Sequence, residues 1–207
     1  MPPESPYAYD DRLRAEGLAP LAGVDEAGRG PLAGPVVASA VVLPPDAGAR
    51  IPGLRDSKRL TPAQRESLFW DILAAAEDIG VGIVDAAEID RINIYRAAKK
   101  AMVTAVEDLS APPRALVIDA MELPLDLRQV SMPRAESVSA SVAAASIVAK
   151  VTRDRLMDHF HALYPLYGFC RHKGYATRMH LEMLGRHGPC PIHRRSFSPV
   201  AALRLPY

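Results

Sequence analysis

Two apolar, β-branched runs lie near the start of the chain, over residues 21–27 and 35–43. A glycine-rich stretch from Gly28 to Gly34 separates them, and Pro44 follows the second run. Strand-forming residues joined by a glycine-containing turn are typical of a β-hairpin. The pattern therefore predicts two paired strands connected by a broad turn.

A capping pattern marks the next element, because Thr61 precedes Pro62 and is followed three positions later by Gln64. Threonine caps a helix start, proline suits the first turn, and the glutamine completes a capping box. Asn93 has the side chain of a second helix cap. The predicted elements of this region are a helix over 61–78, a strand over 79–85, and helices over 86–91 and 93–109.

A short apolar run over residues 115–118 ends at Asp119 and predicts a buried strand. We interpret the polar residues after it as a loop that leads to a long helix. Strands in a hairpin, followed by strands alternating with helices, predict an α/β fold with a mixed sheet. The remaining predicted parts are helices over 139–163 and near 176–187, an irregular lead-in over 1–19, a core over 20–164 and a helical C-terminal part over 165–207.

The composition is that of a globular protein, since 49% of the 207 residues are hydrophobic and 24% are charged. The chain contains no run of 18 apolar residues, and its polar, acidic start lacks the features of a signal peptide. Cys170 and Cys190 are its two cysteines, so a disulfide framework is not expected. We therefore expect a soluble, cytoplasmic protein with no membrane association.

Charge is distributed unevenly along the chain. Residues 1–149 carry 15 Lys and Arg against 21 Asp and Glu, whereas residues 150–207 carry 10 against 3. All six histidines also lie in the second stretch. A basic end on an acidic body suggests a polyanionic partner held beside a carboxylate-rich site. A solvated surface that happens to be basic is the alternative interpretation.

Carboxylates close the apolar strands, with Asp25 and Glu26 ending one run and Asp119 ending another. Several carboxylates together suit Mg²⁺ or Mn²⁺, which are hard cations that prefer oxygen ligands. Two such ions about 4 Å apart can activate a water and stabilise the leaving oxygen of a phosphodiester. Alternatively, these acids cap turns or pair with Arg29 and Lys58.

The geometry of a strand restricts how the first pair can act, because neighbouring side chains point to opposite faces. Asp25 and Glu26 can both point into one site only if the strand bends, and Gly28 makes a bend possible. We expect Asp25 to be the central ligand and Glu26 to contribute at the edge.

The segment Gly28-Arg29-Gly30 permits close approach of a ligand to the backbone. The planar guanidinium group of Arg29 can bind a phosphate through two hydrogen bonds. A plain hairpin turn is the alternative, and neither a GxxxxGK[ST] nor a GxGxxG motif is present. The spacing of His187, Cys190 and His193, with Cys170 and His172 nearby, leaves a zinc site as a weaker alternative. His193-Arg194-Arg195 is more simply explained as an anchor of the tail or a phosphate contact.

Six motifs in order resemble the ribonuclease HII family of bacteria and extend over roughly residues 20–200. They are GVDEAGRGPLAGPV at 23–36, DSKRL at 56–60, INIY at 92–95, AASIVAKVTRD at 144–154, KGY at 173–175 and HRRSF at 193–197. The resemblance implies a ribonuclease H-like core, with a mixed five-stranded sheet, flanking helices and a helical C-terminal extension. It also implies an endoribonuclease that uses Mg²⁺ or Mn²⁺ to incise 5′ to a ribonucleotide. Its implied substrates are RNA/DNA hybrids and single ribonucleotides embedded in duplex DNA.

The resemblance further implies four acidic metal ligands, the first three of which match Asp25, Glu26 and Asp119. The fourth position departs from the usual Lys-Gly-Asp-like triplet, because Arg134-Ala135-Glu136 stands there. Glu136 keeps the charge and lengthens the side chain by one methylene. Asp154 matches a family position one helical turn after Lys150, so we interpret it as a supporting partner of that lysine.

The resemblance implies two kinds of substrate contact. One is a segment that recognises the 2′-hydroxyl of the ribonucleotide, and the other is a tyrosine that contacts the sugar at the RNA–DNA junction. Gly28, Arg29 and Gly30 match the first, and Tyr175 matches the second. Further expected phosphate contacts are Lys58, Asn93, Ser146 and Lys150.

Two other functions stay open at this point. A DNA-only nuclease of the same fold would share the carboxylates but lack the Gly-Arg-Gly and Lys-Gly-Tyr motifs. A nucleic-acid-binding protein with a decayed site is the non-enzymatic alternative. The C-terminal LRLPY shows no convincing sliding-clamp motif, so a clamp partner is left undecided.

Overall fold

The computed structural model describes residues 5–54 and 60–203. The expected phosphate contact Lys58, with most of the DSKRL motif, lies outside the described residues, as does nearly all of the C-terminal LRLPY. In the part of the chain that is described, no helix combines the length and the apolar character needed to cross a membrane.

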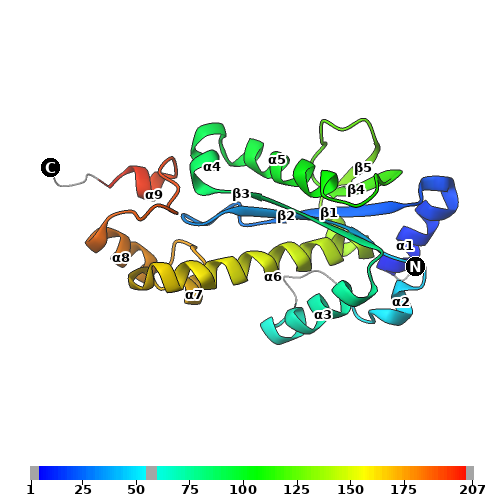
Figure 1. Ribbon diagram of the computed structural model, residues 1–207, viewed down its shortest axis with the longest axis horizontal. Coiled ribbons are helices and arrows are strands. Elements are labelled where there is room, and N and C mark those ends of the chain that lie inside the picture. The colour runs from blue at the N-terminus through cyan, green and yellow to red at the C-terminus, as the bar shows by residue number, and fades with distance from the viewer. Residues whose placement is uncertain (1–4, 55–59, 204–207) are drawn as a thin grey trace.

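A mixed five-stranded sheet forms the centre of the structure, with strand order β3-β2-β1-β4-β5 (Figure 1). Strand β1 pairs antiparallel with β2 on one side and parallel with β4 on the other. This confirms the predicted hairpin and the predicted mixed sheet. The strands are β1 (Leu21–Ala27), β2 (Val36–Val42), β3 (Asp78–Val84), β4 (Ala115–Asp119) and β5 (Arg128–Met132).

Two segments differ from the prediction. Strand β5 lies where we expected a polar loop, and its residues are half-buried or exposed because it is the sheet's edge. The lead-in predicted as irregular contains α1 (Pro6–Leu13), which Ser5 caps. The predicted helix over 61–78 is α3 (Pro62–Ala75), whose capping box is confirmed, but it ends three residues earlier because Asp78 begins β3.

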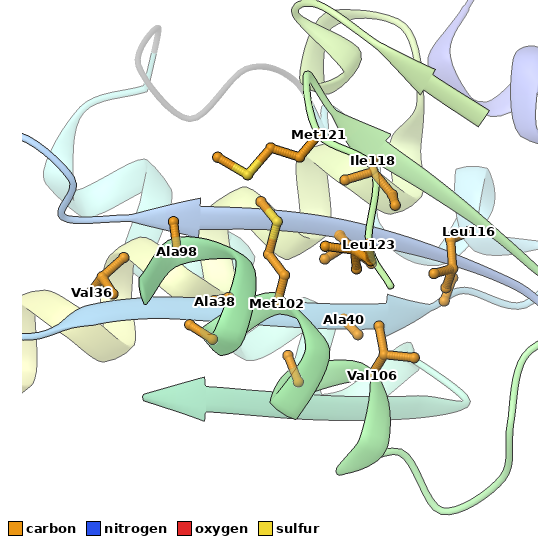
Figure 2. Packing of buried hydrophobic residues seen from close by; sticks show 14 of the residues in the cluster. Val36, Ala38, Ala40, Ala98, Met102, Val106, Leu116, Ile118, Met121 and Leu123 are labelled. Atoms are coloured by element: carbon orange, nitrogen blue, oxygen red, sulfur yellow. The ribbon is translucent and has the colours of Figure 1, made fainter. Parts of the chain in front are cut away.

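Helices cover both faces of the sheet (Figure 1). On one face α5 (Ile94–Glu107) packs over β2 and β3, and its Met102 and Val106 meet alternate residues of β2 (Figure 2). On the other face α6 (Ala140–Leu163) lies along β1 and β2 and also packs against α3. Side chains alternate along β2, so its buried residues contribute to both cores.

Glycines allow these helices to approach the sheet closely. A Cβ atom at Gly82 of β3 would lie 1.9 Å from the carbonyl oxygen of Ala101 in α5. A Cβ atom at Gly23 of β1 would lie 2.1 Å from the carbonyl carbon of Ser141 in α6. Both distances are far inside van der Waals contact, so the packing distance of each helix depends on the missing side chain.

The C-terminal part is helical, as expected, and packs on the glycine-rich segment that follows β1. Leu32 is buried with Leu184 and Val200, and Ala33 is buried with Phe169 and other residues of that part. The remaining elements are the π-helix η1 (Arg14–Leu18), α2 (Ala47–Arg50), α4 (Ala86–Ile92), η3 (Ala135–Ser137), η4 (Pro165–Tyr167), α7 (Phe169–His172), α8 (Arg178–His187) and α9 (Ser198–Ala201).

We predict that Gly82→Ala lowers the free energy of unfolding by about 3 kcal/mol or more, because the new methyl group overlaps main-chain atoms of α5. Urea unfolding monitored by circular dichroism measures the change. Gly185→Ala is the matched control, since a Cβ atom there would meet no other atom within 4 Å and alanine favours the helix. Equal stability of Gly82→Ala and wild type would contradict the packing argument.

Candidate active site

A cleft of about 340 Å³ opens at the ends of β1 and β4. It receives residues from both strands, from the glycine-rich segment, from α3 and α6, and from the loop before α8. The lining residues are Asp25, Glu26, Ala27, Gly28, Arg29, Gly30, Arg65, Asp119, Ser146, Lys150 and Tyr175. Most of the expected site residues are therefore brought together in one place.

The end of β1 places two carboxylates in this cleft. Asp25 is 6% exposed, and its Oδ1 accepts a hydrogen bond from the main-chain N–H of Glu26 at 2.7 Å. Glu26 is less buried, and its Oε1 lies 3.2 Å from Nη1 of Arg29. The chain turns directly afterwards at Gly28, whose φ of 96° lies in the region that glycine adopts readily. Both acids line the cleft, at the place where a bend was expected.

Parallel pairing brings the third carboxylate to the same edge. Val24 is in register with Ile118, so Asp25 and Asp119 follow on neighbouring strands. Oδ1 of Asp119 accepts a hydrogen bond from the main-chain N–H of Ala135 at 3.1 Å, which ties the end of β4 to η3. The sheet topology thus joins acids that are distant in the sequence.

Glu136 lies in η3, next to the residue that Asp119 holds. It is 3% exposed and does not contribute to the lining of the cleft. The turn before it depends on Arg134, whose φ of 60° is left-handed. The expected fourth acid therefore lies beside the residue that Asp119 binds, and it is buried outside the lining of the cleft.

Burial and neighbouring carboxylates raise the pKa values of Asp25 and Glu26. The pKa of Asp25 is raised well above its usual value, first by burial and then by the charge of Glu26, with a smaller effect from Asp119. The pKa of Glu26 is raised by burial and by Asp119, although Arg29 opposes the shift. Crowded carboxylates of this kind are stabilised by a cation that accepts oxygen ligands. The donor set fits Mg²⁺ or Mn²⁺ better than zinc, which prefers nitrogen and sulfur.

The described residues contain no group of three or more His, Cys, Asp or Glu side chains that is already arranged around a metal position. For the zinc alternative, His193 instead contacts Cys190 and His180 through its two ring nitrogens.

Two buried arginines hold the glycine-rich segment from behind. Arg194 donates to the carbonyl oxygens of Gly28, Arg29 and Gly34 at 2.6, 2.9 and 3.0 Å. Arg194 is 0% exposed, and burial, followed by the charge of Arg153, lowers its pKa to about 9. The expected anchoring role of the His193-Arg194-Arg195 motif is thus seen in its central residue.

Arg153, on α6, also binds main-chain carbonyl oxygens, at the far end of the glycine-rich segment. It donates to the carbonyl oxygens of Ala33, Pro35 and Lys173 at 3.0–3.1 Å. Because Lys173 precedes Gly174 and Tyr175, this guanidinium group joins the glycine-rich segment to the loop that carries the tyrosine. Sequence reasoning missed this residue, although it lies inside the AASIVAKVTRD motif.

Positive and aromatic side chains complete the cleft. Lys150 pairs with Asp154 at 2.6 Å, as expected for residues one helical turn apart. Tyr175 is 46% exposed, and its Cε1 would lie 3.8 Å from a Cβ atom at Gly30, so the ring stands beside the glycine-rich segment. Arg65 of α3 also lines the cleft and was not predicted; only its position just after the DSKRL motif hinted at it.

Asn93 is the expected contact that the structure places elsewhere. It does not line the cleft, and its side chain accepts a hydrogen bond from the N–H of Arg96 as the cap of α5. Its φ of 72° shapes the junction between α4 and α5. The structure thus bears out the cap that was predicted from the same residue.

Comparisons with known proteins agree on one family. The family described as Ribonuclease HII matches residues 22–200. A protein of Geobacillus kaustophilus named Ribonuclease HII is 57% identical over 93% of this chain and 73% of its own length. A namesake from Syntrophobacter fumaroxidans is 54% identical over 94% of this chain and 83% of its own length. The crystal structure of ribonuclease H2 from Pyrococcus horikoshii superposes with a TM-score of 0.73 and 32% identity, over 87% and 95% of the two chains.

We predict that Asp25→Asn raises the melting temperature in the absence of divalent cations at pH 8. The pKa of Asp25 is raised by folding, so its ionisation opposes the folded state. This penalty is absent below about pH 4, where the carboxyl group is protonated in both states, and it grows as the pH rises towards the folded pKa. Differential scanning fluorimetry in EDTA at pH 4 and pH 8 measures the difference.

Asp154→Asn serves as the control for this comparison, because it removes a partly exposed ion pair that contributes about 0–1 kcal/mol. An Asp25→Asn protein that melts at or below the wild-type temperature at pH 8 would show that the carboxylates do not strain the fold.

Proposed function

The chain belongs to the ribonuclease HII family and is a ribonuclease H-type endoribonuclease, and we propose that it hydrolyses the phosphodiester bond on the 5′ side of ribonucleotides. The proposed substrates are RNA/DNA hybrids and single ribonucleotides embedded in duplex DNA, and the proposed products carry a 3′-hydroxyl and a 5′-phosphate. The observation that carries the proposal is the single cleft in which strand-end carboxylates face the Gly-Arg-Gly segment and Tyr175.

Asp25, Glu26, Asp119 and Glu136 are the residues that would hold Mg²⁺ or Mn²⁺. A pair of bound ions would supply an activated water and stabilise the charge on the leaving oxygen. Asp25 is the most buried carboxylate of the cleft. It is next to Glu26 in the sequence and next to Asp119 on the neighbouring strand, so it is the best placed to contribute to binding both ions. The raised pKa values of Asp25 and Glu26, caused first by burial and then by neighbouring carboxylates, support this proposal, because a bound cation would offset the repulsion between the ionised groups.

Basic residues of the cleft would hold the nucleic-acid backbone. Lys150 projects from α6, Arg65 from α3 and Arg29 from the glycine-rich segment, so phosphates can be met from three sides. Asp154 keeps the Lys150 ammonium group in place through their ion pair. Ser146 lines the cleft one helical turn before Lys150, and its hydroxyl group hydrogen-bonds the Asp25 carboxyl group, which opposes the rise in the pKa of Asp25.

The choice between ribose and deoxyribose would be made by main-chain groups of Gly28, Arg29 and Gly30. Glycine permits a sugar to approach the backbone closely, and the 2′-hydroxyl can both donate and accept a hydrogen bond. The two buried guanidinium groups fix the shape of this segment before substrate binds. Tyr175, beside Gly30, is then in position to pack on the neighbouring deoxyribose.

We expect a duplex with one ribonucleotide to be cut 5′ to that ribonucleotide in Mn²⁺ or Mg²⁺, whereas the all-DNA duplex is inert. A site built to bind a hydroxyl rejects the analogue that lacks it, because its polar groups are left unpaired. Tyr175→Ala should lower the rate on the single-ribonucleotide duplex more than it weakens binding. Gel assays with labelled strands, together with fluorescence anisotropy in Ca²⁺, measure both quantities.

Comparable cutting of the all-DNA duplex would favour the DNA-only nuclease instead. Binding without cleavage of either duplex, at any divalent cation concentration, would favour the non-catalytic alternative.

We predict that Glu136→Asp retains activity, since it restores the usual family residue, and that Glu136→Gln and Asp119→Asn lose nearly all of it, since each removes a negative ligand at nearly constant size. The rate of cleavage against Mg²⁺ concentration measures the effect, and circular dichroism confirms the fold. If Glu136→Gln stays active while Asp154→Asn does not, the fourth ligand is Asp154 rather than Glu136.

A further inference from the structure

Three buried histidines lie directly behind the loop that carries Tyr175, and the proposed chemistry does not use them. His180 is 0% exposed, His193 2% and His172 8%. The rings of His172 and His180 are stacked, with centroids 4.5 Å apart and an interplanar angle of 15°. The Nε2 atoms of His180 and His193 are 3.0 Å apart, which is a hydrogen-bond distance.

The partners of His193 fix the position of its proton. The main-chain N–H of Cys190 donates to Nδ1 of His193 at 3.0 Å, so Nδ1 carries no hydrogen. In the neutral ring the hydrogen therefore resides on Nε2, which faces His180. The buried setting supports the neutral form, because burial and the neighbouring His180 lower the pKa of His193 to about 4.

The proton on His180 is fixed from its other side. Nδ1 of His180 lies 2.9 Å from the carbonyl oxygen of Tyr175, which can only accept, so Nδ1 must carry the hydrogen. Nε2 is then bare and accepts the hydrogen of His193. A directed relay of hydrogen bonds results, from the N–H of Cys190 through His193 and His180 to the carbonyl of Tyr175.

His172 holds the residue before the tyrosine. Its Nδ1 accepts from the N–H of Gly174 at 3.2 Å, and its Nε2 faces the carbonyl oxygen of Tyr167 at 2.8 Å. Gly174 has a φ of 86°, so the loop here is in a conformation that side chains rarely adopt. The loop is consequently held at two successive residues by two neighbouring histidines.

We propose that His180, with its proton set by His193, is a positioning residue that holds the Tyr175 ring beside Gly30. It acts through the main-chain carbonyl of Tyr175 and does not touch the cleft, whose lining does not include it. The benefit of this positioning for catalysis rests on the function proposed above for Tyr175. The positioning itself does not, and it can be measured in the free protein.

Two substitutions at His180 separate its two hydrogen bonds. His180→Asn places an amide NH₂ where Nδ1 stands, so it keeps the bond to the Tyr175 carbonyl and loses the one to His193. His180→Gln places an amide oxygen where Nε2 stands, so it keeps the bond to His193 and loses the one to Tyr175. His159→Asn and His159→Gln, at an exposed position of α6, are the matched controls.

Nuclear magnetic resonance of the free protein gives the first test. ¹⁵N spectra of the histidine rings at neutral pH should show the hydrogen on Nδ1 of His180 and on Nε2 of both His172 and His193. Contacts between the Tyr175 ring and the Gly30 Hα atoms should persist in His180→Asn and disappear in His180→Gln. A His180 ring protonated on Nε2 alone overturns the proposal, whether or not either variant folds.

Cleavage kinetics give the second test. On the single-ribonucleotide duplex, His180→Gln should lose about tenfold or more in kcat with little change in KM, because a small misplacement of a contact residue slows the reaction. His180→Asn should stay within a few-fold of wild type. Equal losses in both variants, in parallel with their melting temperatures, would show a merely structural histidine and overturn the proposal. If Tyr175→Ala is fully active while the ring contacts behave as stated, the role of Tyr175 fails and the positioning stands.

Discussion

The burial of two guanidinium groups is the constraint on which the cleft depends. Arg153 and Arg194 are almost fully removed from solvent, and together they donate to six main-chain carbonyls. Burying a charge is expensive unless every donor finds an acceptor, so the carbonyls can take up few other arrangements. The planar fork of arginine meets several carbonyls at fixed angles, which the single ammonium group of lysine cannot do. The glycine-rich segment is therefore rigid although glycine is the most flexible residue.

The local features of the site follow from the sequence, whereas the long-range ones do not. Asp25 and Asp119 end apolar runs, and the pairing of parallel strands requires their neighbours to meet, so these two acids could be found from pattern alone. Strand β5 escaped prediction because its five residues are partly solvated at the sheet edge and show no clear alternation. Arg65 escaped because a charged residue on a helix gives no sign of which cleft it faces.

The carboxylate cluster shows a conflict, within a single strand, between the stability of the fold and the metal binding proposed for it. The end of β1 would be more stable with uncharged side chains, since burial and mutual repulsion both oppose the ionised forms of Asp25 and Glu26. The two carboxylates lie at the end of β1, at the edge of the cleft, rather than in the middle of the strand, which is fully buried. Proteins commonly retain such strained groups only where function requires them. Here the strain lies beside a segment that the two arginines keep from relaxing.

The distance along the chain between the parts of this clamp has a consequence for biosynthesis. Gly28 is held by Arg194, which the ribosome adds 166 residues later. Most of the sheet and α6 can be complete while the turn after β1 still lacks its second guanidinium group. Because domains fold as they emerge, a nascent chain can form the end of β1 before the turn after it is held in place. The turn beside the carboxylates thus takes its final shape only when a segment far along the chain has packed against it.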